Sequence, residues 1–407
     1  MASTSRKTAG PALLALGVVL LAINLRSALA SVGPLVPDIR AATGLANPSI
    51  GLLTALPLLA FGLLSAFTSI VTRRLGIEGG VVLALSLVAA GTFARGIPPQ
   101  ALLFGGTILL GVGIALGNVL LPALAKLYFP DRTGSMTSLY SSVMGLGATA
   151  AAGVSAPLAA SFGWRVALSV WAVPALVALG VWIPLARRRR RLDTSAPGPS
   201  RLRALGGSGL AWQIALFMGF QSLTFYVMLA WMPDLLRSQG FGAAAAGGLL
   251  ALSQAAGVLG TAAVPLWAGS MEDQRRIVWI LGILEAGSLA GLFVGGGALA
   301  IASVAVLGFV LGGTFGLALL LLVLRTADAH TAGELSGMAQ SIGYLIAAAG
   351  PTVFGLIHDL SGGWTVPLVF LAAVLVAKVG VGVGAGRPGC VLPMQGDPGP
   401  APRTSPR

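Results

Sequence analysis

The stretch VPDIRAATGLANPSIGLLTALP, residues 36–57, has a counterpart much later in the chain, MPDLLRSQGFGAAAAGGLLALS, residues 232–253. The Pro-Asp pair at 37–38 matches the pair at 233–234, an offset of 196 residues. Recurrence of a long motif at a fixed distance is the mark of an internal structural repeat. The sequence therefore predicts two copies of one unit.

A second pair of segments supports the same duplication. The segment GSMTSLYSSVMGLGATAAAGVSAPLAASFGW, residues 134–164, resembles SGMAQSIGYLIAAAGPTVFGLIHDLSGGW, residues 336–364, with Met136 and Met338 offset by 202. Because the offsets are nearly equal, the two copies run in the same order and orientation.

Composition places both copies in a membrane. Of the 407 residues, 56% are hydrophobic and only 9% are charged, and the mean hydropathy is +0.90. A helix needs about 20 apolar residues to cross a bilayer, whereas barrel strands are shorter and alternate in polarity. We predict twelve helical spans near 12–36, 49–71, 79–96, 100–124, 134–160, 166–186, 210–232, 245–269, 277–296, 299–324, 336–358 and 364–384.

The expected fold is an all-α polytopic membrane protein with twelve transmembrane helices in two parallel six-helix repeats. Such repeats are typical of transporters that bind substrate at the midplane and open alternately to either side. The 58 glycines favour close, movable helix packing. The expected regions are an N-terminus at 1–11, a six-helix bundle at 12–186, a basic linker at 187–209, a second bundle at 210–384 and a disordered tail at 385–407.

The net charge of +13 is unevenly distributed. If the N-terminus is cytoplasmic, inner segments hold 19 of the 25 lysines and arginines and outer loops hold four. This bias follows the positive-inside rule, so we expect a multi-pass protein of the plasma (inner) membrane with both termini cytoplasmic, and no nucleic-acid partner. Two other readings stay open: a signal peptide ending near Ala30, and contact of the 187–203 run with anionic lipids.

The first predicted span carries a family resemblance. Residues 23–39, INLRSALASVGPLVPDI, are similar to the first-helix signature of the cyanate permease and 2-nitroimidazole transporter family within the major facilitator superfamily. The resemblance rests on Asn24-Leu25-Arg26 and on Val32-Gly33-Pro34. It implies the twelve-helix fold, with helices 1, 4, 7 and 10 lining a central cavity. One departure is the loop TRRLGIEGG, residues 72–80, which lacks the aspartate usual in the superfamily.

Arg26 stands out within this span. At 1.5 Å per residue it lies ~20 Å into a hydrocarbon layer of ~30 Å. An arginine there costs roughly 2.5 to 3.5 kcal/mol unless its surroundings compensate. We expect Arg26 to face a wet cavity and bind a polar or anionic ligand, and a structural arginine at a kink before Pro34 is the alternative.

Other polar residues at similar depth complete a predicted substrate site. Asn24 lies two positions from Arg26, so an unwound helix is needed for both to reach one ligand, and an interhelical hydrogen bond is its alternative role. The other predicted substrate-binding residues are Tyr140, Gln221, Tyr226, Gln254, Gln340 and Tyr344. Each alone is more often a packing residue than a ligand contact.

Glu285 is the carboxylate predicted to lie well inside a span. Such a group is a candidate for proton coupling, with a structural role as the alternative on a peripheral helix. Lys378, late in the last span, is expected to extend to the membrane surface.

The leading functional prediction is a secondary active transporter, not an enzyme, that moves a small anionic or polar solute resembling cyanate or a nitroimidazole. Protons are a candidate coupling ion and a monomer is the expected state. A polytopic membrane enzyme and a receptor-like scaffold are the alternatives. The chain has no phosphate-binding loop motif, and its single cysteine, Cys390, allows no disulfide. We expect no cofactor and no metal.

Overall fold

The computed structural model describes residues 10–45, 47–192 and 201–392, and among these residues all regular secondary structure is helical. The long helices are α1 (Pro11–Ala30), α3 (Asn47–Leu64), α4 (Thr68–Ala94), α5 (Gln100–Tyr128), α6 (Thr133–Phe162), α8 (Ala172–Leu192), α10 (Gly209–Ser238), α11 (Ala243–Gly269), α12 (Arg275–Val294), α13 (Gly297–Leu324), α14 (Ala329–Ser361) and α15 (Thr365–Ala385). The short ones are η1 (Gly33–Leu35), α2 (Val36–Thr43), η2 (Ser65–Phe67), η3 (Pro130–Arg132), α7 (Trp164–Ser169) and α9 (Leu202–Gly206).

The twelve long helices occupy the positions of the twelve predicted spans, which confirms the expected fold. Eleven segments of the described chain are long and apolar enough to cross a membrane. The helix at the second predicted span, α3, is not among those eleven. Six long helices precede α9 and six follow it, so the chain consists of an N-terminal and a C-terminal half.

The two copies of the repeat differ at the first helix of each half. In the N-terminal half α1 ends at Ala30, and the chain passes through η1 into the short helix α2. Pro34 lies in η1 and has no N–H to continue an α-helix. The matching helix α10 runs unbroken to Ser238 with Pro233 inside it. The predicted span 12–36 therefore ends in a break that its counterpart lacks.

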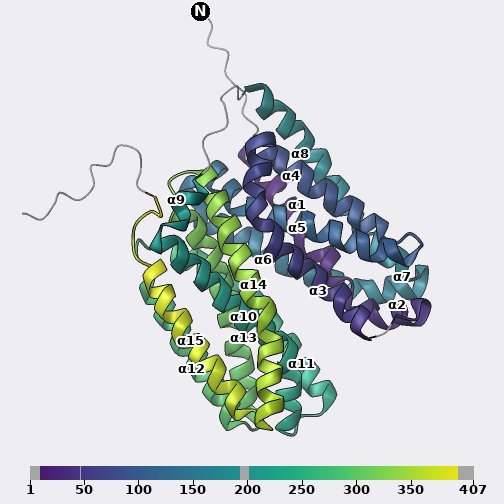
Figure 1. The fold of residues 1–407 in the computed structure, drawn as a ribbon, viewed down its shortest axis with the longest axis vertical. Coiled ribbons are helices and arrows are strands. Elements are labelled where there is room, and N and C mark those ends of the chain that lie inside the picture. The colour runs from purple at the N-terminus through teal and green to yellow at the C-terminus, as the bar shows by residue number, and fades with distance from the viewer. Residues whose placement is uncertain (1–9, 46, 193–200, 393–407) are drawn as a thin grey trace, which may run out of the picture.

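The two halves meet at one end of the bundle and diverge toward the other (Figure 1). We call the end where α8 finishes and α9 begins the linker end, and the opposite end the far end. One hydrophobic cluster joins both halves and includes Leu25 and Tyr140 as well as Phe217 and Tyr344. At the far end each half has a separate cluster. The halves are thus packed together at the linker end.

Contacts between the halves support this closure. Ser138 Oγ of α6 donates to the Ala262 carbonyl of α11 at 2.6 Å. A Cβ atom on Gly134 would lie 2.9 Å from the Cα of Gly269, so these glycines allow the backbones of α6 and α11 to touch. Each of these residues lies on the part of its helix nearest the linker end.

Glycines also bring α13 against α11. A Cβ atom on Gly313 would approach Val264 Cγ2 to 2.7 Å, and one on Gly316 would approach Pro265 Cγ to 2.7 Å. Small residues permit such close helix contacts in membranes, where dispersion forces replace the hydrophobic effect between helices. This close packing fixes the face that α13 turns toward the centre of the molecule.

The predicted boundaries of the linker and tail need adjustment. α8 continues to Leu192, so the basic run beginning at Arg187 starts as helix. At the other end, Val391 is buried and its N–H donates to the Arg325 carbonyl at 2.9 Å. The prediction of disorder is therefore wrong for residues 387–392, because a buried valine and a backbone hydrogen bond hold them against α13. The rest of the predicted tail, and predicted N-terminal residues 1–9, lie outside the described residues.

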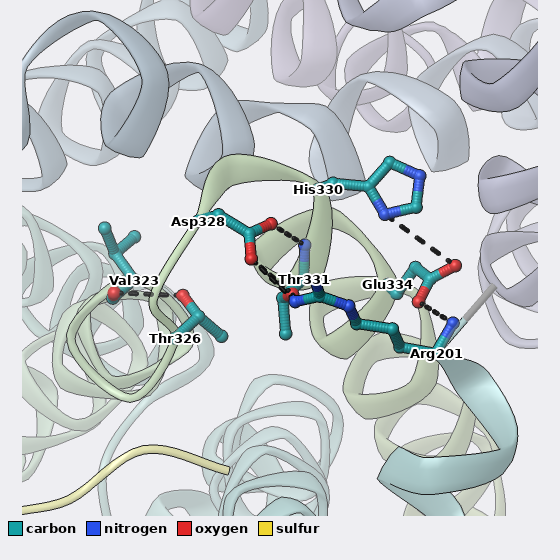
Figure 2. Close-up of polar contacts among 7 residues, drawn as sticks. All are labelled: Arg201, Val323, Thr326, Asp328, His330, Thr331 and Glu334. Carbon is teal, nitrogen blue, oxygen red and sulfur yellow. Dashed lines mark hydrogen bonds and ion pairs between the residues drawn. The ribbon is translucent and has the colours of Figure 1, made fainter. Parts of the chain in front are cut away.

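Arg201, at the end of the linker, is bound to the start of α14 (Figure 2). Its guanidinium Nη1 donates to Asp328 Oδ2 at 2.8 Å and to Thr331 Oγ1 at 2.9 Å, and its backbone N–H donates to Glu334 Oε2 at 2.8 Å. Asp328 is also the N-cap of α14, because its carboxylate accepts from the Thr331 N–H at 2.8 Å. One carboxylate thus starts α14 and holds the linker to it.

We expect Asp328→Ala to destabilise the protein by about 1 kcal/mol through loss of the N-cap, whereas Asp328→Asn should retain most of that contribution. Burial tends to raise the pKa of the Asp328 carboxyl, but hydrogen bonds from Thr331 and the nearby Arg201 charge outweigh it and hold the pKa below its ordinary value. A lowered pKa stabilises the fold at pH values above the ordinary pKa of about 4, and that stabilisation disappears as pH falls below it.

Melting temperatures of the two variants in detergent at neutral and acidic pH test this expectation. Equal melting temperatures for Asp328→Ala and wild type at neutral pH would contradict the capping role.

Candidate functional site

A cavity of about 160 Å³ lies between the two halves. Its lining comes from α1 and α6 of the N-terminal half and from α10, α11, α13 and α14 of the C-terminal half. Five residues predicted from the sequence line this one cavity: Arg26, Gln221, Tyr226, Gln254 and Tyr344. Residues up to about 320 positions apart in sequence therefore meet at the junction of the repeats.

Arg26 is the charged residue of this cavity. Its side chain is half-buried, and its guanidinium carbon lies 5.6 Å from the centre of the Phe315 ring. The Tyr226 side chain lines the same cavity. The described residues that line the cavity include no aspartate or glutamate. The cation consequently has an aromatic partner from the opposite half and no negative counter-charge in the described lining.

Three other predicted residues do not line the cavity. Asn24 is buried and donates to the Leu20 carbonyl at 2.7 Å, because α1 is a regular helix here and turns Asn24 away from Arg26. Tyr140, on α6, is fully buried in the hydrophobic cluster that joins the two halves. Gln340 is buried nearer the linker end, where it donates to the Asn118 carbonyl of α5 at 3.0 Å. Gln340 therefore joins the two halves and does not reach the cavity.

Hydrogen bonds within the lining determine which donors remain available. Ser141, Thr149 and Thr261 each donate their hydroxyl to a carbonyl four residues earlier in the same helix. The Gln221 amide donates to Ser222 Oγ at 2.6 Å. These groups present acceptors, and the Arg26 guanidinium supplies the largest group of donors. The cavity thus favours a ligand with an acceptor-rich, electronegative end.

The sequence analysis missed several lining residues. Phe225, Phe315, Met144 and Ser253 are apolar or small, and such residues are common throughout this chain. Phe315 lies in the segment 308–316, GFVLGGTFG, whose other residues are glycines, apolar residues and one threonine. Spacing alone could not identify the side that faces the cavity.

Glu285 lies away from the cavity, in a buried ion pair. Lys378 Nζ donates to Glu285 Oε1 at 2.5 Å, and both side chains are almost completely buried between α12 and α15. The expectation that Lys378 extends to the membrane surface is wrong, because a buried carboxylate near the middle of α12 offers it a stronger partner. This geometry favours the structural role for Glu285.

The described residues contain no cluster of three or more histidine, cysteine, aspartate or glutamate side chains suited to a metal ion. The two histidines lie on α14, near its two ends, and are not close to each other. The site is thus a binding cavity with one cation, aromatic rings and amides.

Known proteins resemble this chain in sequence and in fold. The family model of the Major Facilitator Superfamily matches residues 14–351. The chain is 41% identical to the 2-nitroimidazole transporter of Escherichia coli over 387 residues, covering 95% of this chain and 98% of the relative. It is also 41% identical to the uncharacterized transporter YycB of Bacillus subtilis over 374 residues, covering 91% of this chain and 92% of the relative.

A more distant relative is the cyanate transport protein CynX of Escherichia coli, 31% identical over 88% of this chain and 93% of the relative. Among solved structures, the proton:xylose symporter XylE superposes with a TM-score of 0.72 at 15% identity, over 91% of this chain and 94% of that chain. This last similarity concerns the fold alone.

The buried ion pair yields a test of Glu285. We expect Glu285→Gln or Lys378→Met to destabilise the protein by roughly 3 to 5 kcal/mol, because each leaves one buried charged group without its partner. The double variant Glu285→Gln, Lys378→Met removes both charges and should recover most of the loss. Melting temperatures in detergent measure the effect.

Transport by the double variant in vesicles separates the two roles of Glu285. A structural pair predicts retained transport once the fold is restored. Loss of transport in a double variant of normal stability would instead indicate that Glu285 takes part in coupling.

Proposed function

The chain belongs to the Major Facilitator Superfamily, and from this premise we propose that it is a secondary active transporter of a small anionic or strongly polar solute, bound at the cavity between its halves. The family and its relatives are membrane transporters, which supports transport across a membrane. The solute and the residues that bind it are proposed from the cavity.

One observation carries the proposal: Arg26 is a cation without a counter-charge, placed in a cavity that both halves form. Buried charges in membrane proteins are expensive unless they are paired. An anion or a nitro group at this position would complete the pairing and accept two parallel hydrogen bonds from the guanidinium fork. Gln221, Tyr226, Gln254 and Tyr344 are the proposed further contacts.

The proposed substrates share this chemistry. Relatives are named as transporters of 2-nitroimidazole and of cyanate, and both compounds are small and rich in acceptors. A neutral sugar would need many free donors, whereas several hydroxyls of the lining are engaged by their own helices. We therefore propose cyanate-like and nitroimidazole-like solutes over sugars.

The alternatives are weaker. An enzyme would need a nucleophile and base, paired carboxylates or a metal near the cavity, and the described lining offers Arg26 alone as a charged group. A receptor-like scaffold would bind the same ligand without flux. Uptake of labelled solute into reconstituted vesicles separates a transporter from both alternatives.

The proposed cycle is alternating access by a single chain in the plasma membrane. We place both termini and the linker end in the cytoplasm on the basis of the charge bias. The contacts between the halves at the linker end then form the cytoplasmic closure. Protons are the proposed coupling ion, and vesicles with and without a pH gradient should differ in uptake.

The first prediction for this function concerns Arg26. Arg26→Lys keeps the charge but loses the planar fork, and we expect it to weaken binding about 10-fold, while Arg26→Gln should weaken binding of an anion about 100-fold, as expected for lost charge-assisted hydrogen bonds. Titration of purified protein with cyanate and with 2-nitroimidazole measures both dissociation constants.

Asn24→Ala, at a residue of the same helix that does not line the cavity, is the matched control and should bind like wild type. Wild-type affinity in Arg26→Gln would refute the proposed site.

The second prediction concerns orientation and motion. In a Cys390→Ser background, a cysteine at Asp234 on the far end should react with a membrane-impermeant reagent in intact cells, and one at Ser270 on the linker end should not. Spin labels at Asp38 and Asp234 should approach each other when ligand is added, because closure around the ligand brings the far ends together.

Reaction of the Ser270 cysteine in intact cells would reverse the proposed orientation. A single distance between the two spin labels, unchanged by ligand, would contradict the rocking motion.

A further inference from the structure

Phe315 lies opposite Arg26 although it belongs to the other half of the protein. It is half-buried and lines the cavity. The glycines on either side of it, Gly313 and Gly316, pack against Val264 and Pro265 of α11. Because any side chain at these glycines would collide with α11, α13 is held in one rotation that turns Phe315 toward α1.

The contact between these two residues has a specific geometry. The Arg26 guanidinium carbon is 5.6 Å from the Phe315 ring centre and lies over the ring. Such cation–π contacts are worth about 0.5 to 2 kcal/mol, depending on solvent exposure. A guanidinium that rests its face on a ring still has its N–H edges free for hydrogen bonds.

We propose that Phe315 is a positioning residue: it holds the Arg26 guanidinium by its face, so that the N–H edge is oriented for the ligand before the ligand arrives. This inference rests on the proposed function of Arg26. Since Arg26 and Phe315 come from different halves, the same contact links ligand binding to the approach of α1 and α13.

The contact also contributes to the stability of a cation in this cavity. The described lining supplies no carboxylate, so the Phe315 ring is a stabilising neighbour of the guanidinium. A pre-oriented group binds more tightly because less conformational freedom is lost on binding. Removal of the ring should therefore reduce affinity without removing the charge.

Binding to purified full-length protein tests the proposal, with 2-nitroimidazole and cyanate as probes. Phe315→Leu should raise the dissociation constant about 3- to 10-fold, as expected for loss of a cation–π contact. Phe315→Tyr should bind within about twofold of the wild-type affinity, because tyrosine keeps an aromatic face. The control is Phe309→Leu, an equal truncation on α13 at a residue outside the cavity lining, which should bind like wild type.

A double-variant cycle in the absence of ligand separates positioning from simple packing. If Phe315 acts through Arg26, Phe315→Leu should lower the melting temperature less in an Arg26→Gln background than in wild type. Equal losses in both backgrounds, or unchanged affinity in Phe315→Leu, would overturn the proposal. Wild-type affinity in Arg26→Gln is a different result, and it would refute the proposed site itself.

Discussion

A charge inside this helical bundle must find its compensation within the protein, because hydrocarbon provides none. Three side chains illustrate three solutions. Lys378 pairs with a buried carboxylate on a neighbouring helix. Arg325, at the end of α13, donates to the carbonyls of Ala385 and Gly386 at 3.0 and 2.9 Å and so ties α15 to α13. Arg26 lies over the Phe315 ring in the cavity between the halves, and this position defines the proposed site.

Close packing through glycine joins the two halves at one end. At the linker end, glycines let α6 touch α11, and one hydrophobic cluster spans both halves. At the far end the halves have separate clusters, and no shared core holds them together there. Movement of one half against the other would therefore break few apolar contacts at the far end. The cavity lies between these two regions and is lined by helices of both halves.

The candidate site was partly predictable. Arg26, Gln221, Tyr226, Gln254 and Tyr344 are polar residues deep in apolar helices, and that anomaly is visible in any sequence. Asn24 and Gln340 show the same anomaly, yet their amides are used by carbonyls of α1 and α5. A polar residue at the right depth can serve the ligand or the fold, and only the direction of the side chain distinguishes these uses.

The sequence alone determined the membrane class, the twelve spans and the two repeats, and it marked Arg26 as a candidate, because hydropathy, duplication and an isolated charge are properties of the linear chain. The tertiary structure decided the break after α1, the partner of Lys378 and the place of Phe315 opposite Arg26. The physical reason is that helix rotation and pairing depend on contacts between residues hundreds of positions apart. In a chain that is apolar on nearly every helix face, no periodic pattern records those contacts.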